Sequence, residues 1–207
     1  MAYFTISEPK NAIFREKGSK FIALIDTVRS KEELDIKLKL IRSKYPDATH
    51  HCYAARLNPI QLVEIHNDDG EPNGTAGLPI LNALRSVNLV DVLIVVVRYF
   101  GGTKLGKGGL ISSYSESSKV VIDESHKIEL MMYTEFELDF NYDQTNLIET
   151  GLNTFHGKFS STDYNEIVQS VIRVPKDFSD QFENYIGDLV WTGIRFKKIG
   201  DLMDFKS

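Results

Sequence analysis

The 207-residue sequence contains little cysteine, no long apolar run and no excess of positive charge. Cys52 is its only cysteine, so neither an intramolecular disulfide nor a four-thiolate zinc site can form, and a reducing compartment is expected. The longest apolar run covers residues 92–97, far short of the ~18 residues that span a membrane. The sequence MAYFTISEPK at the start lacks the basic and apolar segments of an export signal. We therefore expect a cytoplasmic protein without a membrane partner.

The formal net charge of -5 argues against a protein that coats nucleic acid through bulk electrostatics. The charge is unevenly distributed along the chain. Residues 1–126 carry 16 basic and 15 acidic side chains, whereas residues 127–207 carry 8 and 14. Residues 98–119 hold four basic side chains and one acid, Glu116, so a local basic patch is compatible with the negative total.

Hydrophobic patterning and turn residues predict a first domain over residues 1–126. Ser30 and Glu33 form a capping box that should begin a helix, and Pro46 should end it. Thr75 is expected to cap a second helix, and the run at residues 91–100 is apolar on both faces, as in a central strand. We also expect hairpins from residues 12–17 with 20–28 and from residues 49–57 with 62–67, turns at residues 68–74, and a last helix that ends near residue 124.

A second pattern begins at Lys127 and predicts a domain over residues 127–207. The expected elements are a strand at residues 127–140, a helix at 142–155, a strand pair at 157–165 and 166–174, a helix at 175–191 and a strand at 194–203. This βαββαβ order is typical of ferredoxin-like domains. The fold class predicted for the whole chain is therefore α+β with two domains.

The stretch RYFGGTKLGKGGL at residues 98–110 places a glycine-rich loop between a strand and a helix. Gly101, Gly106 and Lys107 fit the phosphate-binding loop of nucleotide hydrolases. Gly108, however, stands where that motif requires a Ser or Thr hydroxyl to bind magnesium. A nucleotide-hydrolysing loop is therefore disfavoured. Two interpretations stay open: an anion site built from backbone N–H groups, the helix N-terminus and lysines, or a purely structural turn.

The strand predicted at THHCYAARL places His50, Cys52 and Arg56 on one face. His50 and Cys52, with His66 and Asp68, are weak candidates for zinc ligands. No spacing pattern enforces that set, so core histidines and a buried thiol are favoured, and no metal or cofactor is expected. His50 and Cys52 should also point in parallel about 6.5–7 Å apart, too far for the hydrogen bond that activates a cysteine nucleophile.

Three carboxylates, Asp68, Asp69 and Glu71, lie in the loop DDGEPNG. Such a group can pair as acid and base or bind a divalent cation. The alternative is a solvated turn with an Asp-Gly corner, which the sequence favours.

The motifs THHCYAAR, DDGEPNGTAGLPIL and RYFGGTKLGKGGL, in this order and at these spacings, resemble those of the YigZ/Impact family. GSKFIA at residues 18–23 is similar to the family's opening segment, and the tail from Lys127 is similar to the C-terminal domain of bacterial members. The resemblance implies an N-terminal domain with the second-domain-like fold of a small-subunit ribosomal protein, followed by a ferredoxin-like domain. It also implies a link to translation, because eukaryotic Impact proteins restrain a stress kinase that phosphorylates a translation initiation factor. It brings no established enzymatic activity to the bacterial branch.

The leading hypothesis is a non-enzymatic, translation-associated protein that engages RNA, the ribosome or a translation-related protein. The expected anion-binding or nucleic-acid-binding residues are Arg98, Gly101, Gly102, Lys104, Gly106, Lys107, Gly108, Gly109 and Arg56. Lys104 is favoured over Lys107, because Lys107 stands where the family has small or polar residues. One alternative is a metal-assisted hydrolase, with catalytic candidates Asp68, Asp69, Glu71 and His50. Another is a protein-protein adaptor that docks through DDGEPNG.

Overall fold

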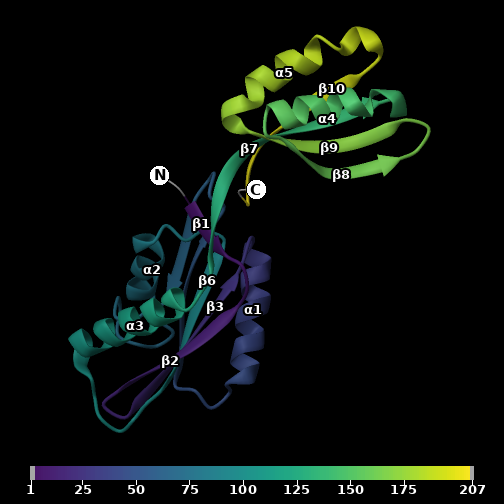
Figure 1. Ribbon diagram of the computed structural model, residues 1–207. Coiled ribbons are helices and arrows are strands. Elements are labelled where there is room, and N and C mark those ends of the chain that lie inside the picture. The colour runs from purple at the N-terminus through teal and green to yellow at the C-terminus, as the bar shows by residue number, and fades with distance from the viewer. Residues whose placement is uncertain (1–2, 206–207) are drawn as a thin grey trace. The chain divides into compact units, whose positions relative to one another are not determined.

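A computed structural model describes residues 3–205 and divides into two compact units, Met1–Leu130 and Met131–Ser207 (Figure 1). The division falls inside strand β7 (Lys127–Phe140). Each unit has its own hydrophobic core. Within residues 3–205, no helix is long and apolar enough to cross a membrane.

The first unit contains a five-stranded sheet with helices on both faces (Figure 1). The strands of this sheet are β2 (Lys10–Glu16), β3 (Ser19–Thr27), β4 (His50–Leu57), β5 (Val63–Asn67) and β6 (Val92–Tyr99). The helices are α1 (Lys31–Lys44), α2 (Gly77–Ser86) and α3 (Gly106–Asp123), and a further strand is β1 (Tyr3–Ile6). The sheet order is β2-β3-β6-β4-β5, so β6 is the central strand. Strand β1 lies outside this sheet and pairs with the first part of β7.

The core of this unit explains why β6 is apolar on both faces. Ile94 and Val96 pack in one buried cluster with side chains of α2 and α3, whereas Leu93, Val95 and Val97 pack in a second cluster with side chains of α1. Successive residues of a strand point to opposite faces. The uninterrupted apolar run therefore marks a strand that is covered on both sides, which confirms the prediction of a central strand.

The local signals at the helix starts had different outcomes. Ser30 Oγ accepts a hydrogen bond from the Glu33 N–H at 3.2 Å and caps α1, as predicted. The predicted Thr75 cap of α2 is wrong, because the Thr75 hydroxyl donates to the Pro72 carbonyl at 2.6 Å instead. The N-cap residue of α2 is Ala76, whose side chain cannot accept a hydrogen bond. A carboxylate from the preceding loop caps the helix instead. Strand β1 was not predicted.

The second unit has the βαββαβ order that the sequence predicted, with short 3-10 turns (η) beside its helices. After β7 come η1 (Tyr142–Gln144), α4 (Thr145–Thr154), β8 (Lys158–Tyr164), β9 (Val168–Pro175), η2 (Lys176–Phe178), α5 (Ser179–Gly187), η3 (Val190–Thr192) and β10 (Arg195–Phe205). Strand β7 pairs with β9 and β10, and β8 pairs with β9. The resulting order β10-β7-β9-β8 is that of a ferredoxin-like sheet, and the α+β fold class is confirmed.

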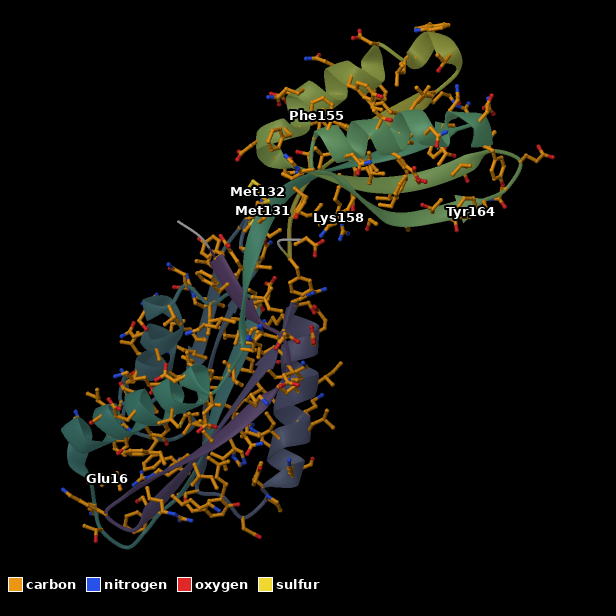
Figure 2. The ribbon with its side chains drawn as sticks, in the orientation of Figure 1. Glu16, Met131, Met132, Phe155, Lys158 and Tyr164 are labelled. Atoms are coloured by element: carbon orange, nitrogen blue, oxygen red, sulfur yellow. The ribbon has the colours of Figure 1, made fainter. Side chains whose placement is uncertain are left out.

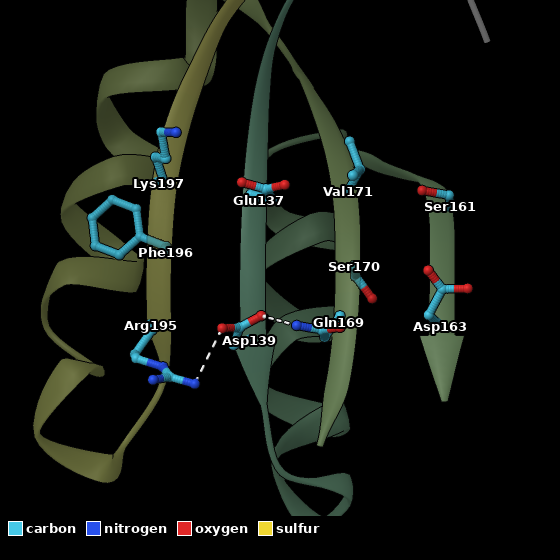
Figure 3. A pocket seen from close by; sticks show the side chains of 10 residues that line it. All are labelled: Glu137, Asp139, Ser161, Asp163, Gln169, Ser170, Val171, Arg195, Phe196 and Lys197. Atoms are coloured by element: carbon cyan, nitrogen blue, oxygen red, sulfur yellow. Dashed lines mark hydrogen bonds and ion pairs between the residues drawn. The ribbon is translucent and has the colours of Figure 1, made fainter. Parts of the chain in front are cut away.

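Helices α4 and α5 cover one face of this sheet (Figure 1). Phe155, labelled in Figure 2, packs there against Phe182, with ring centroids 6.0 Å apart. The opposite face carries a polar groove of about 470 Å³ (Figure 3). Asp139 lies between Arg195 and Gln169 in Figure 3. It pairs with Arg195 at 3.2 Å and accepts a hydrogen bond from Gln169 at 3.3 Å.

Candidate anion-binding site

Two loops that are distant in the sequence line one pocket of about 310 Å³ in the first unit. One loop precedes α2, and the other connects β6 to α3. The lining residues are Glu71, Pro72, Arg98, Phe100, Lys104, Leu105, Gly106, Lys107 and Leu110. The acidic motif and the glycine-rich motif therefore meet at one place.

Glu71 is the polar centre of the inner wall of this pocket. Its Oε1 accepts hydrogen bonds from Arg98 Nη1 at 2.5 Å and from the Tyr114 hydroxyl at 2.8 Å. His50 Nε2 lies 3.8 Å from the same oxygen. A buried carboxylate is tolerated when a charged partner and hydrogen bonds satisfy it. This network fixes the Glu71 side chain in one position.

Arg98 connects the end of β6 to the neighbouring elements. Its Nη2 donates to Ser19 Oγ at 3.4 Å, and its guanidinium carbon lies 5.4 Å from the Phe21 ring centroid and 5.8 Å from that of Phe100. Its Nε is buried and has no hydrogen-bond partner among residues 3–205. The ion pair with Glu71 thus holds the Arg98 guanidinium in place, where it makes a cation-π contact to Phe100.

The outer part of the pocket is basic. Lys104 and Lys107 are exposed, and neither forms an ion pair with another described residue. Helix α3 begins at Gly106 without a side-chain cap. Its first N–H groups therefore lack helical partners and carry the positive end of the helix dipole. This combination of donors and positive charge is suited to an anion.

The glycines of the loop have different roles. A Cβ added at Gly101 would lie 1.9 Å from the backbone carbon of Gly18, so Gly101 allows the loop to pack on the β2–β3 turn. Gly102 and Gly106 have positive φ angles, which favour glycine. A Cβ at Gly109 would lie 3.0 Å from Leu105 Cβ. Gly108 differs from these, because a Cβ there would meet nothing within 4 Å and its φ is not positive.

Asp68 holds the start of α2 in place. Its carboxylate accepts hydrogen bonds from the N–H groups of Gly74 at 2.8 Å and of Ala76 and Gly77 at 2.9 Å each. Burial alone would raise the pKa of Asp68, but these three backbone donors outweigh it, and the pKa lies below its usual value. Asp68 is thus the cap of α2 that the sequence reading assigned to Thr75.

Asp69 fastens the acidic loop to the rest of the unit. It has a positive φ of 44° and accepts hydrogen bonds from the His51 N–H and from Arg42 Nη2, both at 2.7 Å. Both oxygens of its carboxylate are therefore occupied. Of the three acids in the loop, only Glu71 lines the pocket.

The structure does not assemble the weak zinc candidates into a ligand set. Cys52 Sγ lies 2.9 Å from the Asp68 carbonyl oxygen, and His50 Nδ1 lies 2.8 Å from the Asp69 carbonyl oxygen, so both side chains are engaged with the loop backbone. His66 is exposed on β5, where it pairs with Ala54. In the part of the chain that the structure describes, no three His, Cys, Asp or Glu side chains are grouped to hold a metal ion.

Arg56 does not belong to this pocket. It is buried near the far end of β4, where its Nε donates to Glu64 at 3.0 Å and its Nη1 donates to the Leu89 carbonyl at 2.9 Å. In the sheet, Arg56 pairs with Val92, whereas His50 at the other end of β4 pairs with Arg98. Six residues of strand separate the two ends by about 20 Å. The structure therefore corrects the grouping of Arg56 with the glycine loop.

Sequence reasoning missed two residues that support the pocket. Tyr114 is fully buried on α3, and its hydroxyl connects Glu71 to Cys52 Sγ, which lies 3.2 Å away. Ser19 contacts Arg98 and also accepts a hydrogen bond from the Gly101 N–H at 3.2 Å. The only signal for Tyr114 was its position in a helix that follows the glycine loop.

Comparison with known proteins decides the family. The Impact N-terminal domain matches residues 17–122. The chain is also 32% identical over 189 residues to the IMPACT family member YvyE of Bacillus subtilis (strain 168), which covers 91% of this chain and 87% of that relative. The chain belongs to the IMPACT family. The family resemblance inferred from the three motifs is thus confirmed.

Other IMPACT relatives extend this result. The IMPACT family member YigZ of Escherichia coli (strain K12) is 32% identical over 184 residues, with 87% of this chain and 89% of that relative covered. The Protein IMPACT homolog of Dictyostelium discoideum is 40% identical over 95 residues, which are 44% of this chain and 27% of that relative. A crystal structure of a hypothetical protein matches with a TM-score of 0.66 and 28% identity, and covers 96% of this chain and 97% of its own. The two-domain α+β fold is therefore shared with a solved structure.

Proposed function

We propose that this IMPACT family member is a non-enzymatic, translation-associated protein that binds phosphate groups of RNA at the N-terminus of α3. The observation that carries the proposal is the shared pocket, in which the uncapped helix start lies beside Lys104 and Lys107. Lysines that form no ion pair within residues 3–205 and N–H groups without helical partners attract an anion.

The charge of the pocket supports an anionic partner despite the negative total of the chain. Among the lining residues, Arg98, Lys104 and Lys107 are basic and Glu71 is acidic. Arg98 and Glu71 neutralise each other in a buried pair. The two lysines therefore set the sign of the field at the pocket mouth, where the ligand enters.

The link to translation rests on the family. The chain shares the Impact N-terminal domain with eukaryotic relatives that are named IMPACT homologues. The resemblance implies a role in translational control for those relatives, and we extend a translation-associated role, with a cytoplasmic location, to this chain. RNA is the partner whose phosphate chemistry fits the pocket.

The geometry gives the hydrolase alternative less support. A metal-assisted hydrolase needs carboxylates that are free to bind the ion or to activate water. The carboxylates of Asp68 and Asp69 are instead occupied by backbone N–H groups and by Arg42. His50 Nδ1 contacts the Asp69 carbonyl. Neither this histidine nor the two aspartates are among the residues that line the pocket.

Filter binding of the full chain to single-stranded RNA, together with ribosome co-sedimentation, across a series of salt concentrations tests the proposal. We expect binding that weakens as salt rises, with a logarithmic slope of about -0.7 for each phosphate contact. No binding at low salt, or binding that salt does not change, would contradict it.

A further inference from the structure

The pocket has more than a basic mouth, since its inner part offers an aromatic ring and a carboxylate oxygen. We propose that it holds one nucleoside monophosphate unit, with the phosphate at the N-terminus of α3 and the base against Phe100. This inference rests on the proposed function and names the part of the ligand that the pocket takes. The pocket volume of about 310 Å³ is suited to one such unit, because small-ligand pockets start at roughly 300 Å³.

Gly108 supports the position of the phosphate. A glycine inside a helix costs roughly 0.5–1 kcal/mol relative to alanine. The fold gives no reason for this cost at Gly108, because a Cβ there would meet no atom of residues 3–205 within 4 Å and the φ angle lies outside the left-handed region. A missing side chain does leave the N–H groups at the start of α3 open to close approach by a ligand oxygen. Lys104 and Lys107 also line the pocket and can neutralise the phosphate.

Phe100 supports the position of the base. Its side chain follows β6 directly and is 48% exposed, although its ring belongs to the pocket wall. The Arg98 guanidinium carbon lies 5.8 Å from its centroid, and Arg98 is itself held by Glu71. The Phe100 N–H donates to Thr49 Oγ1 at 3.2 Å, which fixes the backbone at this point. An ordered, half-exposed aromatic ring is a surface on which a base stacks.

Glu71 separates a nucleotide from a simple anion. The side-chain contacts that the described residues make to Glu71 all go to Oε1, from Arg98, Tyr114 and His50. Its Oε2 is left as an acceptor on a residue that lines the pocket. A carboxylate repels a phosphate but accepts a hydrogen bond from an N–H or O–H group. The inner pocket is thus suited to a nucleoside, whereas the phosphate belongs at the lysines.

Isothermal titration of the full chain with AMP, ribose 5-phosphate, adenosine and inorganic phosphate tests this inference. We expect AMP to bind about 5- to 150-fold more tightly than ribose 5-phosphate, the gain that stacking of one base provides. Phe100→Ala should remove that gain, and Phe100→Trp should keep it. Lys104→Gln should weaken the binding of all three ligands that carry phosphate. Phe159→Ala is the matched control, since Phe159 is 38% exposed on β8 and does not line this pocket.

Competition distinguishes the two sources of the nucleotide. If AMP displaces a 5′-phosphorylated oligoribonucleotide but not its 5′-hydroxyl form, the pocket holds an RNA end. If AMP binds but displaces neither oligoribonucleotide, the ligand is a free nucleotide. Equal affinity for AMP and ribose 5-phosphate, or no effect of Phe100→Ala, would overturn the inference. If RNA then still binds in a salt-dependent manner, the proposed function stands without it, whereas loss of both RNA and AMP binding removes both.

Discussion

Oε1 of Glu71 lies 2.5 Å from Arg98 Nη1, and the two side chains are only 4% and 6% exposed. This buried pair joins the acidic loop to the end of the central strand, 27 positions further along the chain. Strand β6 ends at Tyr99, one residue after Arg98, and the glycine-rich loop follows it. The position of the candidate site therefore depends on an ion pair that contributes little surface charge.

Removal of Arg98 should destabilise the first unit. Arg98→Met leaves the Glu71 carboxylate buried without its charged partner, which typically costs about 3–5 kcal/mol in the free energy of unfolding. Urea denaturation of the full chain measures this cost. Arg15→Met is the control, because Arg15 is exposed on β2, and a surface substitution usually changes stability by no more than about 0.5 kcal/mol. Equal stability of the two variants would contradict a structural role for the pair.

Asp68→Ala should destabilise the protein in a pH-dependent way. Loss of a carboxylate that caps a helix costs about 0.5–2 kcal/mol at neutral pH. The pKa of Asp68 is lower in the folded chain than in the unfolded chain, so its stabilising effect is full above the unfolded value near pH 4. That effect is lost as the pH falls through the folded pKa.

Urea denaturation at neutral pH and near pH 3 checks the prediction for Asp68. The difference in unfolding free energy between wild type and Asp68→Ala should shrink at the lower pH. Asp35→Ala, at an exposed position on α1, should show a small difference at both. A difference for Asp68→Ala that does not change with pH would show that the carboxylate charge has no part in capping α2.

Two glycines of the loop should respond in opposite ways to alanine. Gly101→Ala places a Cβ 1.9 Å from the backbone of Gly18, so the loop must move and stability should fall by more than about 1 kcal/mol. Gly108→Ala meets no atom and should leave stability unchanged or raise it by up to about 1 kcal/mol. Thermal unfolding of both variants measures these effects. If Gly108→Ala weakens RNA binding but preserves stability, the space at Gly108 is needed for ligand binding. If Gly108→Ala destabilises the protein, that space is needed for folding instead.

Cys52 should be unreactive in the folded protein. Burial raises the pKa of its thiol far above the usual range, and the side chain is fully enclosed. Titration with a thiol reagent at pH 8 should therefore modify Cys52 slowly in buffer and rapidly in urea. Fast modification of the folded chain would contradict this burial and would make Cys52 a candidate nucleophile or metal ligand again.

Much of the fold could be predicted because the signals are local. The two-sided apolar run of β6, the capping box at Ser30 and the βαββαβ order each follow from residues close in the sequence. Strand β1 could not be found in this way, since it forms by pairing with β7 more than a hundred residues later. The prediction of the cap of α2 failed because the capping carboxylate belongs to Asp68, in the preceding loop, and not to the residue just before the helix.

The site was only partly predictable. Motif chemistry identified Lys104, Lys107 and Glu71, which line the pocket, but it could not show that the two loops meet. It also grouped Arg56 with the loop, although the sheet register pairs Arg56 with Val92, at the far end of β6 from Arg98. Tyr114 lies outside the motifs, and the motif GSKFIA, which contains Ser19, gave Ser19 no role. Only the packing of α3 and of the β2–β3 turn reveals their contacts.

RNA binding by a pair of charge-reversal variants tests the central claim most directly. Lys104→Glu and Lys39→Glu change the net charge equally, but Lys104 lines the pocket, whereas Lys39 is exposed on α1, which packs on the opposite face of the sheet. In filter binding with single-stranded RNA, Lys104→Glu should weaken binding about tenfold or more and reduce the salt slope by about 0.7, while Lys39→Glu should bind like wild type. Equal binding by all three proteins would contradict the assignment of this pocket as the site.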